Sequence, residues 1–187
     1  MKIKTLIQES IEELFNDKWF SVYKLDGWYT YVHEKACNGK GVAILGYKKV
    51  DGKYMYVGRY ENCPPHRKGL KLASLTGGVD KNDVIYTAVK EFKEEAGITI
   101  KAEQLIPLGI AHTYKAADTT HYLFAVDCQD LEIGKPTGDG TKGEIDAYCS
   151  WVSEEELVNS LDPLNHMLIM RLKNHETIQK TKSNKKA

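Results

Sequence analysis

The sequence lacks any apolar run near the roughly 20 residues that a membrane-spanning helix requires. Its first ten residues already contain Lys2, Lys4 and Glu9, which leaves no room for the apolar core of a signal peptide. Net charge is also missing, because 26 Lys and Arg residues balance 26 Asp and Glu residues. A general nucleic-acid coat needs a basic surface to neutralise phosphates, so this class is excluded. We therefore expect a cytoplasmic protein with no membrane partner.

Cysteine pairs at metal-site spacing are absent as well. The four cysteines stand at 37, 63, 128 and 149, with no C-x-x-C pair among them. In the absence of a secretory signal they are expected to be reduced thiols. Cys63-Pro64-Pro65-His66 could supply half of a zinc site, but no second half with matching spacing exists. A proline-stiffened loop is the favoured interpretation of this segment.

The 187 residues suit one ordinary domain with short terminal additions. Before residue 36, the apolar spacing from Ile3 to Phe15 predicts an amphipathic helix, and aromatic runs around Asp26-Gly27 predict a hairpin over 19–33. We assign residues 1–35 to an N-terminal extension with this helix and hairpin. Residues 36–175 form the main domain, and the lysine-rich residues 176–187 are predicted to be a disordered basic tail.

Within the main domain, strands and helices alternate without regular βαβ spacing, which favours an α+β class. Strands are predicted over 41–47, 54–60, 104–112, 120–127 and 147–152. The clearest helix spans about 83–96, with Asn82 or Asp83 as its cap and Gly97 at its end. A capping box opens a short helix after Ser153, and Asp162-Pro163 begins a last helix that runs to about Lys173.

Three glutamates share one face of the 83–96 helix. At about 100° per residue, Glu94 lies about 60° to one side of Glu91, and Glu95 about 40° to the other. Like charges at this spacing repel one another, and Mg²⁺ or Mn²⁺ with oxygen ligands would remove that cost. The repulsion also predicts that Glu95→Gln leaves the metal-free protein equally or more stable. An ordinary solvated acidic face is the alternative.

The segment from Lys90 to Ile98 resembles the second half of the Nudix box, G-x5-E-x7-R-E-U-x-E-E-x-G-U, in which U is apolar. It matches the three glutamates, both apolar positions and the glycine. Lys90 replaces the arginine, Asn82 replaces the earlier glutamate, and the stretch after Gly78 is two residues shorter than the pattern. The flanks from about 41 to 157 are also similar to the family, including its W-V-s-x-e-E-L ending.

This resemblance implies an α/β/α sandwich with a mixed sheet. It further implies a Mg²⁺- or Mn²⁺-dependent hydrolase that uses water to cleave the diphosphate between a nucleoside and another group. Carried over by position, the metal ligands are Glu91, Glu94, Glu95 and the backbone carbonyl of Gly77. The base that accepts the proton of the water is Glu91 in some members and a late-loop glutamate in others. Glu144, in the glycine-rich stretch 134–144, is the candidate for the second place, and an ordinary loop glutamate is the alternative.

The substrate branch rests on fewer residues. The segment from Gly41 to Pro65 is similar to the branch that hydrolyses ADP-ribose and nucleotide sugars, which implies Arg59 as a phosphate or ribose contact. The N-terminal helix and hairpin are also similar to that branch, which implies a possible homodimer. Tyr114, sixteen residues past Ile98, is instead similar to dinucleoside-polyphosphate hydrolases and would contact the base. Dinucleoside polyphosphates and nucleoside triphosphates are therefore alternative substrates. A non-catalytic, nucleotide-binding regulatory module is the alternative from another class.

Overall fold

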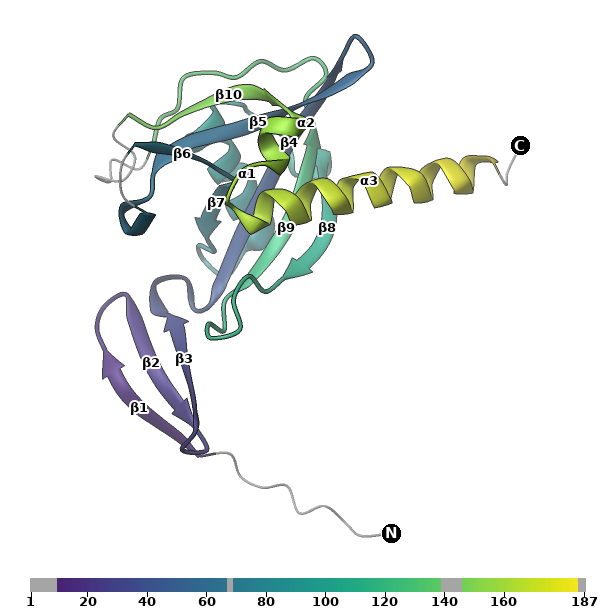
Figure 1. Cartoon of the computed structure of the whole chain (residues 1–187). Helices are drawn as coiled ribbons and strands as arrows, with labels where there is room; N and C mark the ends of the chain where they lie inside the picture. Colours follow the sequence, from purple (N-terminus) through teal and green to yellow (C-terminus); the bar gives the residue numbers. More distant parts are fainter. Residues whose placement is uncertain (1–9, 67–68, 139–145, 185–187) are drawn as a thin grey trace, which may run out of the picture.

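A seven-stranded mixed sheet forms the centre of the molecule in the computed structural model, which describes residues 10–66, 69–138 and 146–184 (Figure 1). Its main path runs in the order β10 (Tyr148–Ser153), β5 (Lys53–Asn62), β4 (Lys40–Val50), β9 (Thr120–Asp127) and β8 (Leu105–Ala111). Short strand β6 (Leu70–Ala73) pairs with β5, and β7 (Leu75–Gly78) pairs with β4. Strands β4 and β9 are parallel, whereas the other pairs are antiparallel. The predicted α+β class with a mixed sheet is confirmed.

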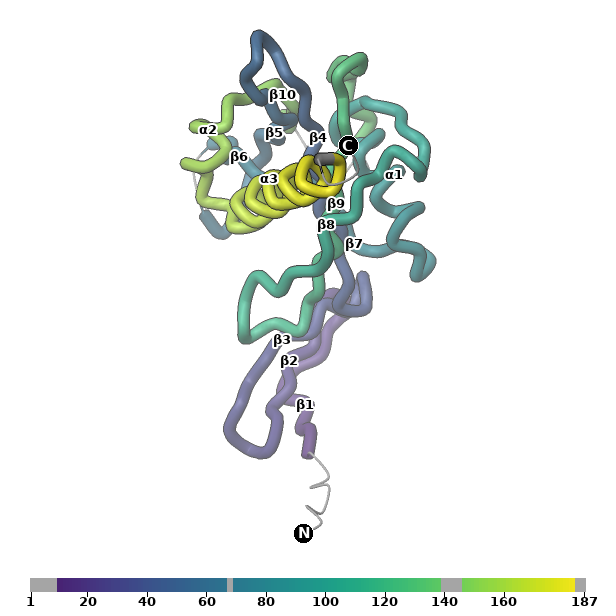
Figure 2. The backbone as a smooth tube through the Cα atoms, turned by 90° about the vertical axis from the view of Figure 1, so that its right-hand side faces the viewer, coloured from purple at the N-terminus to yellow at the C-terminus, as the bar shows by residue number. Residues whose placement is uncertain are grey.

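Helices cover both faces of this sheet. Helix α1 (Val84–Ala96) lies on one side, and α2 (Glu154–Val158) and α3 (Pro163–Asn184) lie on the other (Figure 2). Alternate residues of β4 point to opposite faces, so Val42 and Ile44 pack under α1 while Ala43 and Leu45 pack under α3. Three short 3₁₀ turns complete the chain: Lys35–Cys37, Pro64–His66 and Ala102–Gln104. Among the helices of the described residues, none is long and apolar enough to cross a membrane.

The N-terminal segment is a separate three-stranded sheet of β1 (Ile11–Asn16), β2 (Phe20–Leu25) and β3 (Tyr29–Glu34). It stands away from the main sheet in both views (Figures 1 and 2). The predicted hairpin around Asp26-Gly27 is confirmed as β2 and β3, with both turn residues at positive φ. The predicted helix is wrong over residues 11–16, and its earlier part lies outside the described residues. A register shift between Glu13 and Phe15 absorbs one residue, which makes helix-like apolar spacing compatible with a strand.

The C-terminal helix continues well beyond the predicted end near Lys173. Helix α3 extends to Asn184, so the predicted disordered tail is wrong for residues 176–184, while 185–187 lie outside the described residues. Its first half buries Leu164, Leu168 and Leu172 against the sheet. The second half contains four good helix formers, Glu176, Gln179, Lys180 and Lys182, and it continues a helix whose first half is already fixed by packing.

Candidate active site

Helix α1 is placed by signals at both of its ends. Asp83 caps the start, where its Oδ1 accepts a hydrogen bond from the backbone N–H of Tyr86 at 2.9 Å. Gly97 ends the helix in the left-handed conformation at φ 67°. Both predictions are confirmed, although Asn82 lies before the cap. Because Ala88, Phe92 and Ala96 form the buried stripe, the helix is fixed in rotation about its axis, and Glu95 is 5% exposed beside that stripe.

Glu95 is held by partners from two strands. Its Oε1 lies 2.9 Å from Nη1 of Arg59 on β5, and its Oε2 accepts a hydrogen bond from the backbone N–H of Thr76 on β7 at 3.1 Å. Arg59 is 4% exposed, and its Nε also donates to Glu61 at 2.8 Å. Burial acts to lower the pKa of Arg59, but the charges of Glu95 and Glu61 outweigh burial, so its pKa is raised. Arg59 therefore stays charged and neutralises one of the three box glutamates.

Glu91 packs against a glycine of β7. A Cβ atom placed on Gly77 would lie 2.3 Å from Cδ of Glu91, so only glycine allows this approach. Lys90 lies between Glu91 and Glu94. Its Nζ is 3.5 Å from Oε1 of Glu91 and 3.2 Å from Oε2 of Glu94. The lysine at the arginine position of the box thus keeps a charge between them, without the planar fork that arginine would supply.

Cys149 adds a buried thiol beside this cluster. It lies opposite Arg59 in the β10–β5 pairing, and its Sγ donates to the backbone carbonyl of Glu95 at 3.3 Å. Burial, followed by the charge of Glu95, raises the pKa of this thiol to about 12. Cys149 is therefore protonated at neutral pH and acts as a hydrogen-bond donor to the last turn of α1.

The donor chemistry of the cluster suits a hard divalent cation. Four carboxylates, on Glu61, Glu91, Glu94 and Glu95, share two cations, on Arg59 and Lys90. Carboxylate oxygens are the ligands that Mg²⁺ prefers, so the residue types of this cluster fit such an ion. The carboxylates nevertheless turn toward Arg59, Lys90 and Thr76. Over residues 10–66, 69–138 and 146–184, no three acidic, histidine or cysteine side chains converge to hold an ion.

The predicted substrate-contact and base residues have different locations. Arg59, predicted to contact the substrate, is directed at Glu95 and Glu61 from inside the protein. Tyr114 is 68% exposed in the β8–β9 connection, which binds β3 through the hydrogen bond from Val32 N to Ala116 O at 2.9 Å. Glu144 lies outside the described residues.

Two partners of the cluster were missed by the sequence analysis. One is Glu61, and the other is the backbone N–H of Thr76. Glu61 could have been found, because Arg59 and Glu61 stand two apart on one strand and must share a face. The role of Thr76 left no signal in the sequence, since any residue except proline supplies a backbone N–H.

The architecture and the acidic helix packed on a glycine-containing strand define a Nudix-type hydrolase fold. The sequence pattern of the NUDIX domain matches residues 38–171, and the chain belongs to the Nudix family of pyrophosphohydrolases. No curated protein sequence gives a significant match. The fold is similar to a solved structure described as an ADP compounds hydrolase, with a TM-score of 0.62 and 15% sequence identity. That match covers 95% of this chain and 98% of the other.

Proposed function

We propose that the protein hydrolyses the diphosphate of a nucleoside diphosphate derivative, with ADP-ribose or a nucleotide sugar as the first expected substrate class. The observation that carries the proposal is the packing of the box glutamates on β7, with Glu91 against Gly77 and Glu95 on the N–H of Thr76. Non-catalytic modules of this fold usually lose box glutamates, whereas this chain keeps all three on the helix. The ADP compound in the description of the similar structure supports an adenosine-containing substrate.

Mg²⁺ or Mn²⁺ is part of this proposal. The proposed ligands of the ion are Glu91, Glu94, Glu95 and the carbonyl of Gly77. Lys90 would release Glu91 and Glu94 as the ion binds. When bound, such an ion neutralises phosphate oxygens and lowers the pKa of a coordinated water. The protein itself positions the carboxylates. Arg59 and Thr76 hold the carboxylate of Glu95, and Gly77, which has no side chain, lets Glu91 pack closely against β7.

The hydrolytic step needs a carboxylate base. The water oxygen bonds to phosphorus, and the bond between phosphorus and the bridging oxygen of the diphosphate breaks. The proton of the water passes to the carboxylate. Glu91 and Glu144 are the two candidates, and we favour Glu144 because a base that is also a metal ligand has less freedom to accept a proton. The late-loop position implied by the ADP-ribose branch supports the same choice.

A homodimer also belongs to the proposal. The N-terminal sheet exposes several large apolar side chains, among them Ile11 at 58%, Phe15 at 54% and Trp28 at 74%. Exposed apolar groups of this kind are typical of interaction surfaces. Light scattering on the purified chain tests for the homodimer, and a monomer at all concentrations would contradict it.

The decisive experiment is a substrate panel of ADP-ribose, nucleotide sugars, diadenosine polyphosphates and nucleoside triphosphates with Mg²⁺ and with Mn²⁺. We expect ADP-ribose or a nucleotide sugar to be cleaved fastest, with products separated by chromatography. Preferential cleavage of a diadenosine polyphosphate or a triphosphate would select the alternative substrate class. Tight nucleotide binding without turnover would identify the regulatory module instead.

A further inference from the structure

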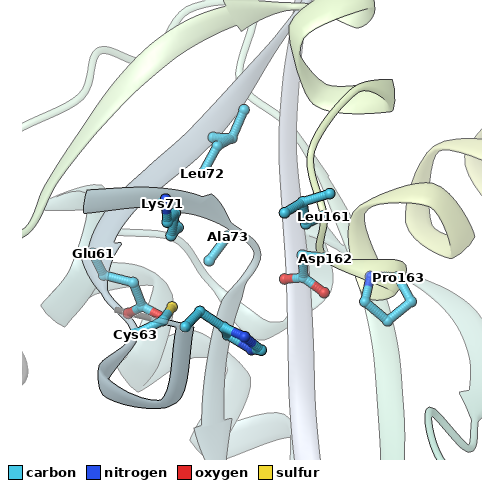
Figure 3. A pocket seen from close by; sticks show the side chains of 9 residues that line it. Glu61, Cys63, Lys71, Leu72, Ala73, Leu161, Asp162 and Pro163 are labelled. Carbon is cyan, nitrogen blue, oxygen red and sulfur yellow. The ribbon is translucent and has the colours of Figure 1, made fainter. Parts of the chain in front are cut away.

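A cavity of about 410 Å³ lies at the edge of the main sheet, between β5, β6 and the connection from α2 to α3 (Figure 3). Binding sites for small molecules typically occupy about 300 to 1,000 Å³. Glu61 and Cys63 at the end of β5 form one side, and Lys71 and Ala73 of β6 lie across from Leu161 and Asp162. Of these residues, Glu61 is connected to the box helix through Arg59.

Two chains of contacts connect the walls of this cavity to Glu95. On the β5 side, Glu61 accepts a hydrogen bond from Arg59, whose guanidinium is paired with Glu95. On the opposite side, Oδ2 of Asp162 accepts hydrogen bonds from the backbone N–H and the hydroxyl of Ser74, at 2.7 and 2.6 Å. Ser74 lies two residues before Thr76, whose N–H binds Glu95. The walls of the cavity are therefore connected to Glu95 on both sides.

The lining combines an apolar surface with the ammonium group of Lys71. Leu72, Ala73 and Pro163 supply apolar contact, and Leu161 is 92% exposed at the edge of the cavity. Such a side chain gains most from covering by a flat apolar ligand. Lys71 differs from Lys90 and Arg59 because no carboxylate within the described ranges forms an ion pair with it. An ammonium group of this kind can bind a phosphate.

The acidic residues of the cavity are already occupied in part. Oδ1 and Oδ2 of Asp162 both accept hydrogen bonds, from Leu164 N and from Ser74. Oε2 of Glu61 accepts a hydrogen bond from Arg59, whereas Oε1 lies 4.0 Å from Sγ of Cys63, which is too long for a strong hydrogen bond. Oε1 of Glu61 can thus accept from a sugar hydroxyl. The cavity offers a cation, an acceptor and an apolar face.

We infer that this cavity binds the nucleoside monophosphate half of the substrate, with the base on Leu161, a ribose hydroxyl on Glu61 and a phosphate on Lys71. The inference rests on the proposed function for its choice of ligand class. It assigns substrate recognition to the β6 edge, in place of Arg59, which is committed to Glu95. The group on the other side of the scissile bond would lie beyond the cavity.

The test is calorimetric binding of AMP and of ribose 5-phosphate to the full chain with Mg²⁺. We expect Lys71→Met to weaken AMP binding roughly tenfold or more, because a charged hydrogen bond to phosphate is lost. Leu161→Ala should weaken AMP binding several-fold and leave ribose 5-phosphate unaffected. Two matched controls, Lys53→Met at an exposed strand end and Val158→Ala on the exposed face of α2, should bind AMP like the original protein.

Three results would overturn the inference: no AMP binding to the original chain, unchanged AMP binding in Lys71→Met, or ribose 5-phosphate binding as tight as AMP. The same variants in the hydrolysis panel separate this inference from the proposed function. If both variants hydrolyse substrate with unchanged KM and bind AMP as before, the cavity is not the AMP site, and the proposed hydrolase activity still stands. If the variants lose AMP binding but the original chain cleaves no compound of the panel, the cavity is the AMP site and the proposed hydrolase activity is wrong.

Discussion

Arg59 and Glu95 form an ion pair of 2.9 Å inside the protein, between the central region of β5 and the last turn of α1. Both residues are about 95% buried, so the pair is shielded from solvent. Breaking such a pair by removing one partner leaves an uncompensated charge, which is strongly destabilising. Glu95 is thus both a member of the acidic face and a structural connection between helix and sheet.

This pair reverses the stability effect predicted from like-charge repulsion. We expect Glu95→Gln to lower the free energy of unfolding of the metal-free protein by about 2 kcal/mol, because a buried charge-assisted hydrogen bond is lost. Glu94→Gln is the matched control, since Glu94 pairs with Lys90 at a partly exposed site where such pairs contribute about 0.5 kcal/mol or less. Urea unfolding in the presence of a chelator measures both. A Glu95→Gln variant that is as stable as the original protein, or more stable, would show that repulsion, and not the Arg59 pair, dominates.

Much of the fold followed from local patterns, and the exceptions have physical causes. Asp83 and Gly97 fixed the ends of α1, because capping depends only on neighbouring residues. The strand β1 was mistaken for a helix, because its register shift removes the two-residue period that identifies a strand.

The site was predictable only in part. The spacing of Glu91, Glu94 and Glu95 placed them on one helix face, but their partners Arg59 and Thr76 come from strands distant in the sequence. Tertiary contacts of this kind leave no periodic pattern, so Arg59 appeared to be free for substrate. The long α3 shows the same limit, because its second half is mostly polar and only continues the half that packs on the sheet.

Gly77→Ala tests the close approach of β7 to the box. The added methyl group would meet the carboxyl carbon of Glu91, so the Glu91 side chain must move away. We expect weaker Mg²⁺ binding and a loss of turnover of roughly 100-fold, as a displacement of about 1 Å in an active site commonly produces. Calorimetric titration with Mg²⁺ and steady-state kinetics on one preparation measure the two effects.

Gly78→Ala is the neighbouring control. Its methyl group would meet Cβ of Cys37 at 2.8 Å and leaves Glu91 untouched. A change in stability without a comparable loss of Mg²⁺ affinity is expected. If both alanine variants lose Mg²⁺ binding equally, the glycine pair matters through the backbone of the loop and not through its contact with Glu91.

His121 makes the stability of the fold depend on pH. Its Nδ1 is buried without a hydrogen-bond partner among the described residues. Burial lowers the pKa of its imidazole below the ordinary 6.5, an effect that Glu34 and Asp162 oppose and His112 reinforces. The unfolded chain therefore binds a proton at a higher pH than the folded one. The contribution of His121 to stability is complete above pH 6.5 and is lost as the pH falls through the folded pKa.

We expect the free energy of unfolding to fall by up to about 1.4 kcal/mol per pH unit below that point through this one group. His121→Gln should flatten the curve below about pH 6.5, measured by urea unfolding at several pH values. His66→Gln, at an exposed position, is the control and should leave the slope unchanged. A slope that persists in His121→Gln would assign the effect to other groups, with Glu34, Asp162 and His112 as the first to replace.

The identity of the base is decided by paired variants at Glu144 and Glu91. If Glu144 is the base, Glu144→Gln should lower turnover roughly 100-fold or more, because general-base catalysis contributes about that much. Its Mg²⁺ affinity should stay near normal, since the proposed ligands are on α1 and β7. Glu91→Gln should lower turnover and Mg²⁺ affinity together, because Glu91 is the glutamate that packs on Gly77.

Glu103→Gln, at an exposed position before β8, controls for the loss of one negative charge and should change neither turnover nor Mg²⁺ affinity. Near-normal turnover in Glu144→Gln, with activity abolished in Glu91→Gln, would transfer the role of base to Glu91 and leave Glu144 as an ordinary loop residue.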